Sequence, residues 1–224
     1  MAQQEDIAAF FRVEGVLIDR GALAASAYFA SNAKGFAERA YRMGALALGA
    51  PLYGLLAQSD RGLATRAAYL ALRRMSEDRI CELSDEYYDD VLRDRIYERG
   101  RELIKAVRKE GMRVVLLSEG IEQVTSRLAA EIGADDYVCN RLEFDAGEAT
   151  GKLLAPVMGG HDGAKWVRGY AEKAGISLAA SAAYAANGAD LLLLARVGRP
   201  CAVNPDLALR AAARDADWPV LEYR

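Results

Sequence analysis

The sequence is poor in the residues that build metal sites and disulfide frameworks. It contains one histidine, His161, and three widely spaced cysteines, Cys81, Cys139 and Cys201, with no Cys-x-x-Cys pair. This spacing fits neither a zinc site nor a disulfide framework, so we expect reduced core cysteines in a cytoplasmic protein. His161 lies in a loop flanked by glycine, where we expect a surface residue rather than a catalytic base.

The chain also lacks an excess of positive charge and a long apolar run. Its 29 Lys and Arg residues are balanced by 32 Asp and Glu residues, which excludes the electrostatic footprint of a nucleic-acid-binding protein. The N-terminus carries two acids and no basic segment, so we expect no secretory signal. The longest suspect stretch, residues 43–57, has no charge but is shorter than the roughly 20 residues that span a membrane. Because Pro51 and three glycines interrupt it, we expect a buried helix pair, with a membrane-surface or partner-facing patch as the alternative.

Apolar segments of strand length alternate along the chain with helical patterns. Strands are expected at 8–13, 113–120, 136–140, 181–186, 200–204 and 219–223, and residues 142–153 alternate around Asp-Ala-Gly as a hairpin does. Residues 20–95 contain no convincing strand. The pattern predicts an α/β fold: a Rossmann-like, doubly wound, mainly parallel sheet formed by 1–19 and 96–224, with 20–95 as an inserted all-helical cap.

Polar side chains gather where several of these strands end. Arg12 and Glu14 follow the first strand, Ser118 ends the second, and Asn187 and Asp190 follow the strand at 181–186. In doubly wound sheets, ligands bind at the carboxyl ends of the strands. We therefore expect these residues to form one site.

The order of these motifs resembles the haloacid dehalogenase (HAD) superfamily, in particular its phosphoserine-phosphatase-like subclass IB. The resemblance rests on "AFFRVEGVLI", on "VVLLSEG", on "ADLLLLARVG" followed by "AVNPD" at 202–206, and on the helical insertion in the place of the family's cap. It implies the HAD fold. It also implies phosphatase chemistry, in which one aspartate attacks a phosphate ester, a second aspartate is the acid and base, and Mg²⁺ is bound by carboxylates.

In this resemblance the catalytic positions are degenerate. The nucleophilic aspartate falls on Arg12, which has no lone pair with which to attack, and the second aspartate falls on Glu14. One metal-binding aspartate falls on Ala186, while Asp190 is kept. Glu14 and Asp190 thus remain from the acidic set, and we expect no metal cofactor.

The phosphate-binding positions are better preserved. Ser118 keeps the family's hydroxyl, and Asn187 stands beside it in the predicted site. The family's lysine falls on Lys165, with Lys152 as the alternative. Glu119 follows Ser118 directly, and we expect a solvent-facing turn residue there, with a residue that faces the site as the alternative.

We expect the guanidinium of Arg12 to replace Mg²⁺ and to pair with Glu14 and Asp190, as Arg and carboxylates do in bidentate pairs. Its role is either that of a ligand-binding or switch cation or that of a structural ion pair in an inactive site. The sequence thus indicates a phosphatase-like protein without catalysis, which binds a protein partner or a small phosphorylated or apolar ligand, with a homodimer as a further possibility. The competing hypothesis is a HAD hydrolase that acts on a small phosphate monoester through an atypical site and uses Mg²⁺.

Overall fold

The computed structural model describes residues 6–19, 21–159 and 161–223. Its centre is a seven-stranded sheet in the order β4-β3-β2-β1-β5-β6-β7, parallel except for β4, which pairs antiparallel with β3. The strands are β1 (Ala8–Arg12), β2 (Arg113–Ile121), β3 (Asp136–Asp145), β4 (Glu148–Leu154), β5 (Ala182–Ala185), β6 (Arg199–Val203) and β7 (Val220–Leu221). The predicted α/β class, parallel sheet and hairpin are confirmed.

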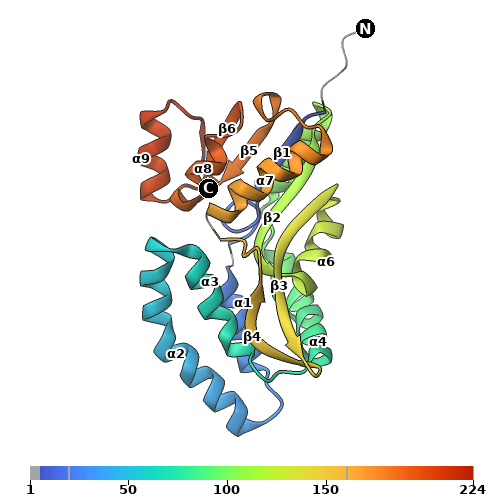
Figure 1. Ribbon diagram of the computed structural model, residues 1–224, viewed down its shortest axis with the longest axis vertical. Coiled ribbons are helices and arrows are strands. Elements are labelled where there is room, and N and C mark those ends of the chain that lie inside the picture. Colours follow the sequence, from blue (N-terminus) through green and yellow to red (C-terminus); the bar gives the residue numbers. More distant parts are fainter. Residues whose placement is uncertain (1–5, 20, 160, 224) are drawn as a thin grey trace.

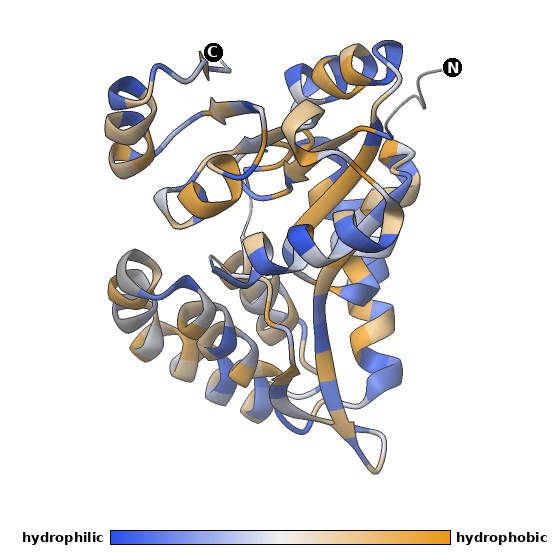
Figure 2. Ribbon diagram, turned by 45° about the horizontal axis from the view of Figure 1, so that its top comes forward, coloured by the Kyte–Doolittle hydropathy of each residue, from blue (hydrophilic) through white to orange (hydrophobic). Residues whose placement is uncertain are grey.

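The central strand β1 is buried on both faces. Ala8 and Phe10 face one apolar cluster, and Ala9 and Phe11 face another, because successive side chains of a strand point to opposite sides. Helices cover both clusters: α5 (Glu98–Lys109) and α6 (Glu122–Ile132) contribute to one, and α7 (His161–Ala174), α8 (Leu191–Leu194) and α9 (Leu207–Asp215) to the other. In Figure 2 the strands of this core are orange, whereas the part of β3 that leaves the core alternates between blue and orange.

The segment between β1 and α5 contains helices and turns and, among its described residues, no strand of the sheet. It contains α1 (Ala22–Ser31), α2 (Phe36–Ser59), α3 (Arg61–Tyr69) and α4 (Glu77–Tyr87), joined by short turns that include a 3₁₀ turn at Leu70–Leu72. Figure 1 shows these helices as the lower half of the molecule, beside the end of the β3–β4 hairpin. We refer to them as the cap. The predicted cap boundary at residue 20 lies outside the described residues.

The structure differs from the expected buried helix pair at 43–57. This stretch lies within the single helix α2, and Leu48 and Leu55 are 85% and 68% exposed. Pro51 stays inside the helix. Among the described residues, no helix is both long enough and apolar enough to cross a membrane.

The cysteines also differ in part from expectation. All three are free thiols, but only Cys201 is buried, whereas Cys139 is half-buried and Cys81 is exposed on α4. Burial raises the pKa of the Cys201 thiol to about 11, which keeps it protonated at neutral pH.

Candidate functional site

The site begins at the carboxyl end of β1, where the last strand residue is Arg12. Since β1 lies between β2 and β5, Arg12 projects into the middle of the sheet's carboxyl edge, and it is only 1% exposed. A guanidinium at such a depth requires partners, because an unpaired buried charge is very costly.

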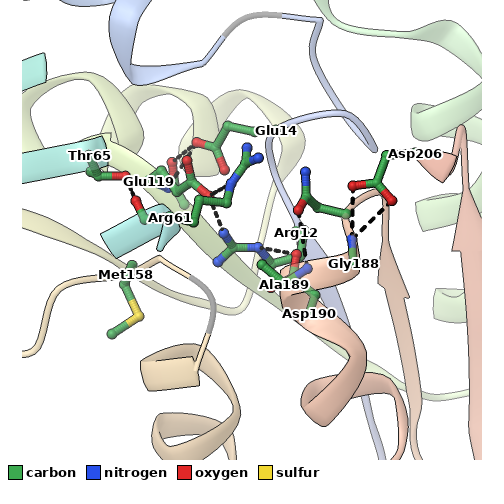
Figure 3. A network of polar contacts seen from close by, with 12 residues as sticks. Arg12, Glu14, Arg61, Thr65, Glu119, Met158, Gly188, Ala189, Asp190 and Asp206 are labelled. Atoms are coloured by element: carbon green, nitrogen blue, oxygen red, sulfur yellow. Dashed lines mark hydrogen bonds and ion pairs between the residues drawn. The ribbon is translucent and has the colours of Figure 1, made fainter. Parts of the chain in front are cut away.

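Two carboxylates hold this guanidinium. Nη2 of Arg12 lies 2.7 Å from Oε1 of Glu119, and Nε lies 3.2 Å from Oδ2 of Asp190 (Figure 3). Burial alone would lower the pKa of Arg12, but the charges of Asp190, Glu119 and Glu14 raise it above its ordinary value. Arg12 therefore remains a cation in the folded protein. The predicted pair with Asp190 is present, whereas the predicted pair with Glu14 is replaced by one with Glu119.

Glu119 also binds an arginine of the cap. Arg61 is the first residue of α3, and its Nε donates a hydrogen bond to the same oxygen, Oε1, that Arg12 contacts. The side chain of Asp60 caps the helix by accepting from the amide of Leu63 at 3.0 Å, which fixes the turn that carries Arg61. Burial lowers the pKa of Arg61, but Glu119, with smaller contributions from Glu14 and Asp190, raises the pKa above its ordinary value. One carboxylate thus joins the core sheet to the cap.

Glu14 turns away from Arg12 toward the end of β2. Its Oε1 accepts hydrogen bonds from the hydroxyl of Ser118 at 2.8 Å and from the amides of Glu119 and Gly120 at 2.9 and 3.2 Å. The left-handed turn at Gly15, with φ of 84°, follows directly. Burial and the charge of Glu119 raise the pKa of Glu14, and they outweigh Arg12, which lowers it. Glu14 therefore keeps a proton to a higher pH than an exposed glutamate does.

Ser118 uses its whole hydrogen-bonding capacity within the protein. Its hydroxyl donates to Glu14 and accepts from the amide of Gly120 at 2.9 Å and from the hydroxyl of Thr125 at 3.3 Å. A serine hydroxyl offers one donor and two acceptor positions. A phosphate would have to displace one of these internal partners to reach it.

The segment after β5 supplies one charged residue of the site. Asp190 is 2% exposed, and burial raises its pKa even though Arg12 acts to lower it. The side chain of Asn187 instead caps the short turn by accepting from the amide of Ala189 at 3.1 Å. Ala186 lies against Gly15, where an added Cβ would be 2.5 Å from the Cβ of Ala186.

The predicted lysines lie outside this network. Lys165 is exposed on α7 and lines a surface groove with Trp166 and Lys173. Lys152 is exposed on β4, beside Arg73 and Arg74 of the cap. The position of the second cation is taken by Arg61. His161 is exposed, as expected.

The donor set does not fit Mg²⁺. Within residues 6–19, 21–159 and 161–223, no group of three or more His, Cys, Asp and Glu side chains is placed to hold a metal ion. Mg²⁺ requires oxygen ligands in near-octahedral geometry, but here a guanidinium lies between Glu119 and Asp190, and Ala186 provides no carboxylate.

Several buried polar atoms of the network have no hydrogen-bond partner among the residues that the structure describes. They are Nη1 of Arg12, Oε2 of Glu14, Oε2 of Glu119 and Oδ1 of Asp190. Three carboxylates face two guanidinium groups, so a proton on one carboxylate would make the cluster neutral. Glu14 and Asp190 both have a raised pKa and an oxygen without a partner among the described residues, so both are candidates for that proton.

Sequence reasoning missed Arg61 and gave Glu119 a place in the site only as the alternative. Glu119 was expected to face solvent, but its side chain is fully buried. The available signal was its position between Ser118 and Gly120 at the end of an apolar strand. Arg61 gave no such signal, because only the packing of the cap on the core brings it to Glu119.

Comparison with known proteins agrees with this architecture. The family of haloacid dehalogenase-like hydrolases matches residues 9–195. The chain belongs to this family. Within the family it is phosphoserine-phosphatase-like in sequence, since it is similar to a protein named as a phosphoserine phosphatase.

Two curated relatives illustrate the likeness. The chain is 28% identical to phosphoserine phosphatase SerB1 of Mycobacterium tuberculosis over 77% of this chain and 56% of that protein. It is 32% identical to the "inhibition of morphological differentiation protein" of Streptomyces azureus over 70% of this chain and 57% of that protein. The chain therefore spans just over half the length of these HAD relatives.

Solved structures extend the similarity of the fold. A Bordetella pertussis protein of unknown function superposes with a TM-score of 0.81 at 21% identity, over 97% of this chain and 99% of the other. A substrate-bound phosphoserine phosphatase superposes with a TM-score of 0.74 at 16% identity, over 99% and 95%. At these identities the likeness concerns the fold.

Proposed function

We propose that this HAD-family protein does not hydrolyse phosphate esters and that it acts by binding. The observation that carries the proposal is the buried Arg12 at the end of β1, held by Glu119 and Asp190. In the family resemblance this position is that of the attacking aspartate. An aspartyl-phosphate mechanism requires a carboxylate there, and a guanidinium offers no electron pair for the attack.

The remaining groups do not replace the missing nucleophile. Glu119 binds two arginines through one oxygen, and Asp190 is tied to Arg12. Glu14 accepts three hydrogen bonds, and its raised pKa lowers the fraction of carboxylate. A nucleophile must be free and ionised, and none of the three acids meets both conditions.

The charge of the site also argues against a phosphate as its ligand. Three acids and two arginines already leave one excess negative charge unless a proton is bound. A phosphate dianion would add to this charge and would have to compete with Glu119 for Arg12 and Arg61. We therefore place the binding role on the cap, whose helix α2 exposes its uncharged stretch.

Phosphatase activity tests this proposal directly. With p-nitrophenyl phosphate and Mg²⁺, we expect the same background rate for the wild-type protein and for Ser118→Ala, beside an active phosphoserine phosphatase measured in parallel. Turnover that depends on Mg²⁺ and is lost in Glu14→Ala or Asp190→Ala would overturn the proposal.

The second candidate is a hydrolase of small phosphate monoesters that uses an atypical site. It is supported by the carboxyl group of Glu14, which keeps the family's acid-base position and has a raised pKa suited to proton donation. In that case, turnover should fall as pH rises through the pKa of Glu14, and Glu14→Gln should abolish it while leaving the fold intact.

A further inference from the structure

The cap contains a cleft that is separate from the Arg12 site. It lies between α2 and α3, has a volume of about 650 Å³, and is also lined by Leu23 of α1. Cavities of this size are typical of small-molecule binding sites. In Figure 1, α2 and α3 lie side by side at the outer edge of the cap.

The cleft is open because the facing side chains are small. Ala45 and Gly49 of α2 stand opposite Ala67 and Ala68 of α3 and Ala71 of the following turn. A Cβ built on Gly49 meets no atom within 4 Å. Helices that pack closely normally interdigitate larger side chains and leave few voids, so this pair of helices leaves a channel that its own residues do not fill.

The walls of the cleft favour an aliphatic ligand. Residues 43–57 of α2 carry no charge, and Leu46 and Leu70 add apolar surface on the two sides. Apolar walls provide few hydrogen bonds for water, and a hydrocarbon that covers them removes apolar surface from solvent. Transfer of each methylene group from water contributes about 0.8 kcal/mol.

Positive charge lies at one side of the cleft. Arg73 and Arg74 are exposed on its lining, and within the part of the chain that the structure describes neither forms an ion pair. Arg42 also lines the cleft, but its guanidinium is 2.6 Å from Glu38 and donates to the carbonyl of Arg73 at 3.1 Å. The charge of Arg42 is thus largely balanced, whereas Arg73 and Arg74 can meet an anion.

Two acids lie near these arginines. Asp145 and Glu148 line an adjacent groove together with Arg73, Arg74 and Lys152. The three cations exceed the two acids there, so the shared rim keeps a positive balance. This rim suits a ligand with one small anionic group rather than a ligand with several anionic groups in a row.

From these features we propose that the cap cleft binds a single aliphatic chain that ends in a carboxylate, that is, a long-chain fatty acid. The chain lies between α2 and α3, and the carboxylate meets Arg73 and Arg74. This inference does not depend on whether the Arg12 site is catalytic, because the two sites share no lining residue.

Fluorescence titration of the full chain with cis-parinaric acid, an 18-carbon fluorescent fatty acid, tests the proposal, with palmitate as the competitor. Gly49→Leu and Ala71→Leu fill the cleft from its two sides and should each weaken binding about tenfold or more, as the loss of apolar contact over two methylene groups would. Gly54→Leu is the matched control on the same helix, because Gly54 does not line the cleft and an added Cβ there meets no atom within 4 Å. Thermal unfolding of each variant establishes that it folds. If Gly49→Leu does not fold, Ala71→Leu alone tests the filling of the cleft.

The head group is tested separately. Arg73→Gln with Arg74→Asn should weaken palmitate binding about tenfold while leaving hexadecanol unaffected, and Arg66→Gln, an exposed arginine of α3 outside the cleft, should change neither. Asparagine is chosen because Arg74 has a positive φ of 63°. Failure of the wild-type protein to bind either probe, or unchanged binding in both leucine variants, would overturn the proposal. Equal affinity for hexadecanol, tighter binding of hexadecyl phosphate, or a dimer that closes the cleft to the probe would overturn it as well.

Discussion

Arg12 and Glu119 form an ion pair of 2.7 Å in which both side chains are almost completely buried. The same carboxylate oxygen accepts a hydrogen bond from Arg61, so one acid of the core strand β2 carries two arginines from separate parts of the chain. The arginines and carboxylates of this network balance one another's charge within the protein, as in a structural ion cluster. Its stability and its pH dependence can be measured without knowledge of any ligand.

Removal of Arg12 should strongly destabilise the fold. Arg12→Ala leaves Glu119 and Asp190 without their shared cation, and breaking a buried pair costs about 3–5 kcal/mol in the free energy of unfolding. Urea unfolding measures this difference. Arg101→Ala is the control, because Arg101 forms a partly exposed pair with Glu131 at 3.2 Å, whose loss should cost less than about 1 kcal/mol. Equal effects of the two substitutions would contradict the ion cluster.

Arg61 and Glu119 should show energetic coupling between the cap and the core. A double-mutant cycle of Arg61→Ala and Glu119→Gln isolates their interaction, for which we expect about 1–3 kcal/mol, as is typical of residues in one ion network. The same cycle with Arg66 in place of Arg61 is the control, since Arg66 is an exposed residue of the same helix. Additive effects for the pair of Arg61 and Glu119 would show that the contact does not hold the cap.

The stability of the protein should fall as pH rises above the acidic range. The folded-state pKa values of Glu14 and Asp190 are both raised, chiefly by burial. The native state therefore keeps protons that the unfolded chain has already released above its pKa of about 4, so the unfolding free energy is largest below that pH and decreases through the folded-state pKa values. Glu14→Gln, which stays neutral, should reduce this slope in unfolding curves recorded from pH 4 to 8. A slope unchanged from that of the wild type would exclude Glu14 as the protonated group.

A repaired site should bind Mg²⁺ only when the cap cation is also removed. Arg12→Asp, Glu14→Asp and Ala186→Asp together restore the acids that the family resemblance implies, but Arg61 would still lie beside Glu119 as a competing charge. Calorimetry should show weak or no Mg²⁺ binding for this triple variant and clear binding after the addition of Arg61→Ala. If the triple variant already binds as tightly, Arg61 does not compete with the metal.

The sequence predicted the sheet and the place of the site because both depend on local patterns. Apolar runs identified the strands, and polar residues at strand ends identified the edge where Arg12, Ser118 and Asp190 meet. The partners of Arg12 depend on side-chain direction and on packing across the cap. Glu14 was expected beside Arg12 because the two stand two residues apart, but Arg12 is the last residue of β1, and Glu14 lies in the turn and faces the amides of β2.

The predictions for Lys165 and α2 also depended on tertiary packing, which the sequence pattern does not show. Gly163, two positions before Lys165, lies close to the site: a Cβ added to it would be 3.8 Å from Nη1 of Arg12. The side chain of Lys165 is nevertheless exposed at the surface. A helix rich in Leu and Ala at 43–57 was expected to be buried, because apolar helices usually are. Only the tertiary arrangement shows that α2 lies at the outside of the cap.

The β3–β4 hairpin has a mechanical consequence for the cap. The segment that leads into the cap and the segment that leads out of it pair with each other through a bridge between Ile18 and Ile96. If these two segments were the cap's whole connection to the core, the cap could rotate about the line of this bridge. The hairpin adds a third attachment away from that line, because Ala149 of β4 exchanges backbone hydrogen bonds of 2.8 Å with Arg74 and Met75. Since β3 continues from this attachment into the core sheet, any opening of the cap must bend that strand or break the backbone bonds that join the hairpin to the cap.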